Sequence, residues 1–323
     1  MSESIIFNLY KKYYVNDQTP AELVTSYWRY YHGKAQMEVN ERDLYTIHVE
    51  GFGDLQNASL AYMTGSWLTI VLYLAMFPNR WELIKTIKVA QYLTKSMGLS
   101  FTYDCFRQMC SLALVRSKLK NQGKLTMMSI GDGYGFLSGL YKKFYPNSSI
   151  VLVDLGKSLF FQARELKEAF PNLRHYLVQG DETSTEAFQG YDFIFCPAEH
   201  VNVLQGVVFD FAYNIASMQE MTNPTIKKYF DFLRANMTKE NLFYCCNRIE
   251  KIMDGGEITR FEEYPWDQGD RYLVDADCPW MKFFISGQKT RRGFKIGQWR
   301  VPLINYFDGD LKHRLTILKT FPK

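Results

Sequence analysis

The hydrophobic and polar positions divide the chain into two parts with different periodicities. In the first part, helical spacing predicts one helix that begins at Thr19 and three more over 54–77, 81–97 and 103–119. In this part of the chain, only 43–49 shows the alternation of a strand. We therefore expect a helical N-terminal domain over 1–120. It would serve as a substrate lid, as an oligomerisation surface, or simply as packing along one edge of a sheet.

The second part alternates between apolar runs and amphipathic helices. Runs that suit buried strands lie at 127–130, 150–153, 175–178, 191–196, 207–213 and 242–246. Helices are expected between them, for example over 157–170, where Leu159, Ala163 and Leu166 share one face. Strands that alternate with helices build a mostly parallel sheet with ligands at the carboxyl ends of the strands. The pattern predicts an α/β domain over 121–323.

A glycine-rich turn follows the first of these strands. Its sequence, GDGYG, consists of Gly131, Asp132, Gly133, Tyr134 and Gly135. Glycine allows a turn to bring its backbone close to a ligand, although a turn can also use glycine for steric reasons alone. A helix should begin at about residue 136, and the unpaired N–H groups of its first turn suit an anionic group.

The next buried strand ends in a carboxylate. Asp154 follows Gly135 by nineteen positions (154 − 135), a spacing that suits hydrogen bonds to ribose hydroxyls. The dinucleotide pattern GxGxxG is not met, because the third glycine is displaced to Gly139. The GxGxG form instead resembles motif I of class I S-adenosylmethionine (SAM) methyltransferases. That resemblance implies a Rossmann-like class I methyltransferase sheet and SAM as the cofactor. Since Ser129 stands where many of those enzymes carry an acidic residue, Asp132 is our candidate for the methionine amino group.

A second resemblance spans about 125–267. The segments VVFDFAYNIASMQEM, TNPTIKKYFDFLR, NLFYCCNR and FEEYPWD are similar to a family of sugar O-methyltransferases. The family pattern of a strand from Asp to Asn, followed by Ser and Glu-Met, is matched by Asp210, Asn214, Ser217, Glu220 and Met221. The resemblance implies methyl transfer to a sugar hydroxyl in polysaccharide or glycoconjugate biosynthesis. It also implies that the strand over 207–213, and not the strand over 191–196, lies beside the SAM methyl. It also adds Gln162, Asn214 and Ser217 to the cofactor-binding candidates.

A sugar hydroxyl is a poor nucleophile, so a general base would assist the reaction. The candidates at strand ends are His200 and Glu220, and we favour His200 because Glu220 is equally suited to holding SAM or starting a helix. Arg248 is a candidate for orienting the acceptor or binding a phosphate on it. Tyr264 and Trp266 lie in a polar and aromatic segment typical of sugar-binding loops, or of an ordered surface excursion.

Composition narrows the classes of function. A net charge of +4 over 323 residues, with no block of five basic residues, lacks the electrostatic footprint of a nucleic-acid binder. The six cysteines form no CxxC pair and lie mostly in apolar runs, which indicates reduced, buried thiols and not disulfides or a zinc site. The five histidines are dispersed, which argues against a His-rich metal centre, and metal-assisted methyl transfer stays an alternative for which no dense Asp cluster singles out ligands.

No signal peptide is visible, and the apolar run 61–77 contains polar positions that favour a buried helix over a membrane span. We therefore expect a cytoplasmic protein that acts on a small molecule or a glycan, with a homo-oligomer left open. Two other functions also stay open. One is an NAD-dependent sugar epimerase or reductase, which the displaced glycine and the lack of a YxxxK pair disfavour. The other is a non-catalytic assembly partner of a glycosyltransferase or methyltransferase.

Overall fold

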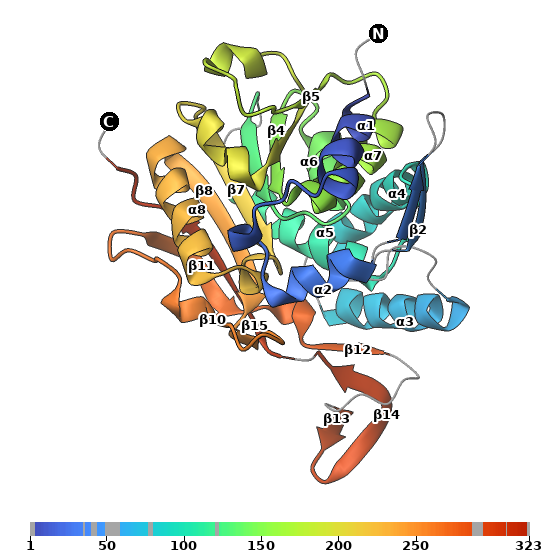
Figure 1. Ribbon diagram of the computed structural model, residues 1–323. Helices are drawn as coiled ribbons and strands as arrows, with labels where there is room; N and C mark the ends of the chain where they lie inside the picture. The colour runs from blue at the N-terminus through green and yellow to red at the C-terminus, as the bar shows by residue number, and fades with distance from the viewer. Residues whose placement is uncertain are drawn as a thin grey trace.

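An eight-stranded sheet forms the centre of the protein (Figure 1). The computed structural model describes residues 4–34, 36–39, 44–48, 59–76, 80–119, 123–285, 293–307 and 309–321. The strand order is β11-β15-β8-β7-β3-β4-β6-β5. The strands are β3 (Thr126–Ile130), β4 (Ser149–Asp154), β5 (His175–Leu177), β6 (Phe193–Pro197), β7 (Phe209–Ile215), β8 (Met237–Arg248), β11 (Arg271–Asp277) and β15 (Leu311–Ile317). Only β15 runs in the direction opposite to the other seven strands. The sheet is therefore mostly parallel, and the predicted Rossmann-like α/β class is confirmed.

Helices cover both faces of this sheet (Figure 1). One face carries α4 (Arg80–Ser96), α5 (Tyr103–Arg116), α6 (Phe136–Phe144) and α7 (Gly156–Ala169), and the other carries α8 (Asn223–Asn236). Successive side chains of a strand point to opposite faces, so Met127 enters the core on the α6 side and Met128 the core on the α8 side. This is why the central strands read as continuously apolar. The N-cap of α8 is Thr222, whose side chain accepts the Thr225 N–H.

The N-terminal part packs on the sheet through a shared core, because apolar residues of α4 and α5 join those of α6 and β3 in one cluster.

The helix expected from Thr19 is interrupted, since Val24 is extended with φ −103° and ψ 108°. Of the expected helix over 54–77, the structure shows the part from Leu60, and 54–58 and 77 lie outside the described residues. The division into domains 1–120 and 121–323 stays a prediction. The elements are α1 (Ile5–Tyr10), the π-helical turn η1 (Lys11–Val15), η2 (Ala21–Leu23), α2 (Ser26–Lys34), β1 (Gln36–Val39), β2 (Leu44–His48) and α3 (Leu60–Met76).

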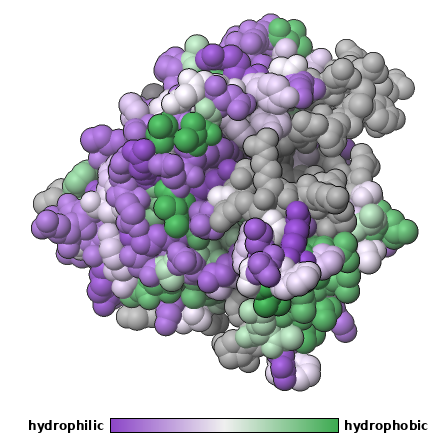
Figure 2. Space-filling view, turned by 90° about the horizontal axis from the view of Figure 1, so that it is seen from below, coloured by the Kyte–Doolittle hydropathy of each residue, from purple (hydrophilic) through white to green (hydrophobic). Residues whose placement is uncertain are grey.

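The C-terminal part adds a small sheet that projects at the bottom of Figure 1, built from β12 (Phe283–Ile285), β13 (Gly293–Ile296) and β14 (Trp299–Tyr306). It is joined to α3, because the Ile285 N–H donates to Thr69 Oγ1 at 2.8 Å and Phe283 stacks on Tyr73. Figure 2, seen from below, shows hydrophobic residues gathered on part of this side of the molecule. In α3 and β14, Val71 and Leu303 are each 58% exposed. Within the described ranges no helix has the length and apolar character that a membrane span requires. The remaining short elements are η3 (Thr185–Phe188), η4 (Ala198–Leu204), η5 (Met218–Glu220), β9 (Glu250–Ile252), β10 (Ile258–Arg260), η6 (Phe261–Glu263) and η7 (Pro279–Met281).

Candidate functional site

A pocket opens at the carboxyl ends of β3, β4 and β7, where ligands of such sheets bind. In accord with the order implied by the resemblance, β7 pairs with β3, whereas β6 pairs with β4. The walls come from the turns after these strands and from the N-terminal helices. The lining residues are Leu23, Trp28, Asp104, Arg107, Gln108, Gly131, Asp132, Gly133, Leu137, Asp154, Leu155, Ala198, Tyr213, Ile215, Ala216, Ser217, Glu220, Met221, Thr225 and Tyr229.

The glycine turn and Ser217 fit directly against each other at this pocket. Gly131 and Gly133 have φ values of +71° and +58°, in the left-handed region that glycine adopts without strain. A Cβ on Gly131 would lie 1.9 Å from Ser217 Oγ, which no side chain tolerates. Gly131 is therefore required both by its backbone conformation and by the close approach of the segment after β7.

Asp132 caps the helix that follows the turn. Its carboxylate accepts hydrogen bonds from the N–H of Leu137 at 3.3 Å and the N–H of Ser138 at 2.7 Å, and also from the Ser138 hydroxyl. Burial raises the pKa of Asp132 to about 7, although these hydrogen bonds oppose the shift. The expectation that the first turn of this helix offers unpaired N–H groups to an anionic ligand is therefore wrong, because the chain supplies its own carboxylate there.

Asp154 reaches the pocket from the end of β4, and hydrogen bonds from Leu155 and Gln162 fix its carboxylate. Its Oδ1 accepts the Leu155 N–H at 2.8 Å and its Oδ2 accepts Gln162 Nε2 at 2.5 Å. Burial raises the pKa of Asp154 to about 7, and the nearby carboxylates of Asp132 and Glu220 add to the shift. Gln162 lies outside the pocket lining and orients Asp154 through this bond, and its role in binding a cofactor stays a prediction.

Asn214 connects the ends of three strands beneath the pocket. Its side-chain amide donates to the Ile130 carbonyl at 2.8 Å and to Ser217 Oγ at 3.1 Å, and its oxygen accepts from Met218 N–H and from Asn247. Asn214 is fully buried and lies outside the lining, which makes it a positioning residue for Ser217 and the glycine turn.

The two candidate bases lie in different places. Glu220 lines the pocket, and its Oε1 accepts from Lys251 Nζ at 2.7 Å; burial raises the pKa of Glu220, while Lys251 opposes the shift. His200 is not among the lining residues. It packs on Gly180 and bonds to Lys12 Nζ at 3.0 Å, and burial, together with that lysine, lowers the His200 pKa. The geometry therefore favours Glu220, against the preference drawn from the sequence.

Five further candidates lie outside the pocket lining. Tyr134 is buried beside Phe161, and the left-handed Gly135 begins α6. The backbone N–H of Arg248, at the end of β8, donates to Gln219 Oε1. Tyr264 and Trp266 belong to the core on the α8 side, where the Trp266 ring packs against Phe230. None of these five residues lines the pocket, so their functional roles stay predictions. They are Tyr134, Gly135, Arg248, Tyr264 and Trp266.

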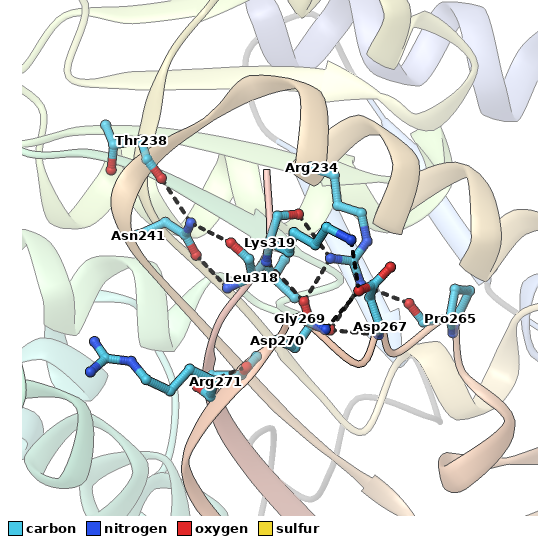
Figure 3. A network of polar contacts seen from close by, with 11 residues as sticks. Arg234, Thr238, Asn241, Pro265, Asp267, Gly269, Asp270, Arg271, Leu318 and Lys319 are labelled. Carbon is cyan, nitrogen blue, oxygen red and sulfur yellow. Dashed lines mark hydrogen bonds and ion pairs between the residues drawn. The ribbon is translucent and has the colours of Figure 1, made fainter. Parts of the chain in front are cut away.

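The segment around Trp266 is tied to the rest of the fold by polar contacts. Arg234 of α8 forms a two-pronged ion pair with Asp270, at 2.7 and 2.9 Å, and also donates to the carbonyls of Pro265 and Lys319 (Figure 3). The Asp270 side chain is 0% exposed. These contacts fix the loop to α8 and to the chain after β15, away from the pocket.

Sequence reasoning missed the contribution of α5 to the pocket. Asp104, Arg107 and Gln108 lie there at i, i+3 and i+4, so they form one stripe on the helix surface. The signal was a polar stripe along a helix whose other positions are largely apolar. Leu23 and Trp28 were also missed, and no motif in the sequence marks them.

Neither a reactive cysteine nor a metal-binding group is found among the described residues. All six cysteines are buried free thiols, as predicted, and burial raises the pKa of Cys105 and Cys196, which disfavours reactive thiolates. Among the described residues, no group of three His, Cys, Asp or Glu side chains is arranged to hold a metal ion.

Comparison with known proteins gives partial similarities of fold. No family model and no curated protein matches the sequence. A solved cyclopropane synthase from Mycobacterium tuberculosis shares 15% identity over 43% of this chain and 42% of its own, with a TM-score of 0.31. Coclaurine N-methyltransferase, solved with S-adenosylhomocysteine (SAH), shares 12% identity over 55% of this chain and 51% of its own, with a TM-score of 0.38. A SAM-dependent methyltransferase from Leishmania major shares 13% identity over 72% of this chain and 82% of its own, with a TM-score of 0.40. The chain thus spans about half the length of the first two proteins.

Proposed function

We propose that the protein is a SAM-dependent O-methyltransferase that methylates a sugar hydroxyl, in polysaccharide or glycoconjugate biosynthesis. The observation that carries the cofactor assignment is the position of Asp132. A dinucleotide would place its pyrophosphate at the N–H groups that begin the helix after the glycine turn. Asp132 already occupies the N–H groups of Leu137 and Ser138, and its negative charge would repel a pyrophosphate. The NAD-dependent alternative is disfavoured for this reason.

The charges of the pocket wall suit SAM, which carries a sulfonium and an amino group. Asp132, Asp154 and Glu220 all line the pocket, and a cation nearby favours their ionised forms. Asp154 would accept hydrogen bonds from the ribose hydroxyls, and Asp132 would accept from the methionine amino group. Gly131 and Gly133 leave the backbone of the turn accessible to the ligand.

SAM, when bound, supplies a methyl group already activated by the positive sulfur. The protein then has to orient the acceptor hydroxyl in line with the methyl and to exclude water. Glu220 would take the hydroxyl proton as the O–C bond forms and the S–C bond breaks. Lys251, bonded to Glu220 at 2.7 Å, holds that carboxylate in place. The sugar as acceptor class rests on the resemblance of 125–267 to the sugar O-methyltransferase family.

Replacing Asp154 tests the cofactor assignment. Asp154→Ala should weaken SAM binding by about 1.5–3 kcal/mol, because charge-assisted hydrogen bonds to the ribose are lost. Calorimetric titration with SAM and with NAD measures both affinities, and Asp181→Ala, an exposed Asp outside the pocket lining, is the matched control. Tighter binding of NAD than of SAM, or an unchanged SAM affinity in Asp154→Ala, would refute the assignment.

Replacing the two candidate bases separates their roles. Glu220→Gln keeps the size of the side chain and should lower kcat by roughly 10²–10⁴ while SAM affinity stays near wild type. His200→Gln is the matched change outside the pocket lining and should leave kcat nearly unchanged. Turnover is followed as SAH release at saturating SAM. Loss of kcat in His200→Gln with full activity in Glu220→Gln would reverse the assignment.

A further inference from the structure

The small C-terminal sheet carries a hairpin that projects from the body of the protein (Figure 1). Its strands β13 and β14 are joined by the two-residue turn 297–298. Such turns favour glycine, and Gly297 has a left-handed φ of +60°. All six residues from 295 to 300 are exposed. These six residues, the hairpin tip, are therefore presented to the surroundings and do not belong to the core.

Two large apolar side chains stand opposite each other at the hairpin tip. Ile296 and Trp299 are paired across the two strands, so their side chains lie on the same face of the hairpin. They are 67% and 76% exposed, and no aromatic residue in the described part of the chain is more exposed than Trp299. A single exposed apolar side chain is common on protein surfaces. A cross-strand pair at a projecting tip adds little to the core and indicates an apolar contact outside the protein.

Basic residues follow immediately behind this apolar pair. Lys295 and Arg300 are also paired across the strands, one residue, or about 3.4 Å, further from the turn. The sequence over 282–307 contains six basic residues and no acidic one, although the net charge of all 323 residues is only +4. Lys282, at the start of this segment, is exposed as well. The small sheet is thus a local concentration of positive charge with an apolar end.

An anionic lipid bilayer matches this order of apolar and basic residues. Tryptophan and aliphatic side chains favour the boundary between headgroups and acyl chains, and Lys and Arg just behind them reach the lipid phosphates. An acidic glycan would pair with the basic residues, but it offers no hydrocarbon layer for Ile296. A second copy of the chain, docked tip to tip, would bring two sets of basic residues together, and like charges repel. The charge and the apolar pair together therefore favour the bilayer.

We propose that the hairpin tip is a peripheral membrane anchor. It inserts Ile296 and Trp299 into the interface of an anionic bilayer and places Lys295 and Arg300 at the lipid phosphates. The attachment is reversible, because a few apolar side chains and charges supply far less binding free energy than a membrane-spanning helix. The anchor is independent of the methyl transfer proposed above, since none of its residues lines the pocket.

The first experiment measures binding of the wild-type chain to lipid vesicles by co-sedimentation, so it does not depend on the folding of any variant. Vesicles of equal parts phosphatidylglycerol and phosphatidylcholine are compared with vesicles of phosphatidylcholine alone, in about 0.1 M and about 0.5 M NaCl. We expect binding to the anionic vesicles at the lower salt concentration, weaker binding at the higher one, and little binding to the neutral vesicles. No binding to the anionic vesicles, or equal binding to both kinds, would overturn the proposal.

The second experiment tests the hairpin tip itself. Trp299→Ala should lower the partition coefficient onto the anionic vesicles roughly tenfold, and Lys295→Gln should lower it roughly fivefold. Both side chains are exposed, so these changes remove no buried contact. Tyr92→Ala on α4 and Lys239→Gln in β8 are the matched changes at exposed positions outside the tip and should leave binding near wild type. An unchanged partition coefficient in Trp299→Ala, or an equal loss in the control variants, would refute the role of the tip.

Light scattering without lipid tests a second copy of the chain as the occupant of the tip. The wild type and Trp299→Ala are expected to have the same mass in solution, because the tip does not join copies of the chain. A wild-type dimer that Trp299→Ala converts to a monomer would assign the tip to an interface between copies and overturn the membrane anchor.

Discussion

At the scale of single residues, Gly131 is fixed by a contact that no side chain tolerates. Gly131→Ala would place a Cβ 1.9 Å from Ser217 Oγ and 2.5 Å from Ser217 Cβ, in addition to the left-handed strain at φ +71°. We expect a loss of stability clearly above the roughly 1–2 kcal/mol of the left-handed conformation alone, and a loss of SAM binding. Urea denaturation and calorimetry measure the two effects.

The chain offers a matched control for this change. Gly98 has φ +64°, and a Cβ added there would have nothing within 4 Å, so Gly98→Ala isolates the backbone contribution. Gly131→Ala combined with Ser217→Gly removes the steric clash and should recover much of the lost stability. Equal destabilisation by Gly98→Ala and Gly131→Ala would mean that the contact with Ser217 is unimportant.

The two aspartates of the pocket predict a pH dependence of SAM binding. Burial raises the pKa of Asp132 and of Asp154 to about 7 in the ligand-free protein. Ribose hydroxyls and the positive sulfur favour the ionised carboxylates, so binding lowers both pKa values. SAM affinity should therefore be full above pH about 7 and should weaken, by up to about tenfold per pH unit and per group, as the pH falls below it. Calorimetry across this range measures the effect. Asp154→Asn should flatten the profile, and a profile of unchanged slope would contradict the role of Asp154.

At the scale of elements, the strands that are buried on both faces were predictable. The six apolar runs overlap β3 to β8, because a strand covered by helices on both sides is apolar at most positions, with few exceptions such as Ser129 in β3 and Asp210 in β7. The bounds of β8 were less predictable. It begins at Met237 and not at 242, since Lys239 and Glu240 near its start are exposed.

The C-terminal strands were missed for a physical reason. In β15, the buried positions include His313, Arg314 and Thr316, where an apolar pattern would have marked a strand. These polar groups are satisfied by partners on other strands: Tyr244 lies 3.2 Å from His313 Nδ1, and Asp275 pairs with Arg314. Such partners are distant in sequence, so periodicity alone does not reveal them.

The same limit explains which parts of the site were predictable. Gly131, Asp132, Gly133, Asp154, Ser217 and Glu220 sit in motifs close to strand ends, and the structure brings all of them to one pocket. The polar stripe of α5 reaches the pocket only through the packing of the N-terminal helices, which no local pattern specifies. Aromatic residues illustrate the converse limit. The sequence placed Trp266 in a sugar-binding loop or an ordered surface excursion, and it did not reveal that the Trp266 ring packs against Phe230.

At the scale of the whole molecule, the buried ion pair between Arg234 and Asp270 connects three distant segments. Arg234 belongs to α8, Asp270 to the loop before β11, and Lys319 follows β15; the Lys319 carbonyl accepts from Arg234 and its N–H donates to Asp270 Oδ1 (Figure 3). The two charged side chains are 6% and 0% exposed. The cost of burying both charges is offset only while the pair and its additional hydrogen bonds remain complete.

Breaking this pair should destabilise the whole fold and not merely its loop. Asp270→Ala leaves a buried guanidinium without its counter-charge, and we expect a loss of about 3–5 kcal/mol in the free energy of unfolding. The control is Asp231→Ala on α8, which removes the exposed pair with Lys227 and should change stability by at most about 0.5 kcal/mol. Replacing both partners, with Arg234→Met and Asp270→Leu, removes the unpaired charge and should recover most of the loss. Urea denaturation of these variants and the wild type measures the differences. If the Asp270→Ala variant proved as stable as the Asp231→Ala variant, the pair would not hold the three segments together.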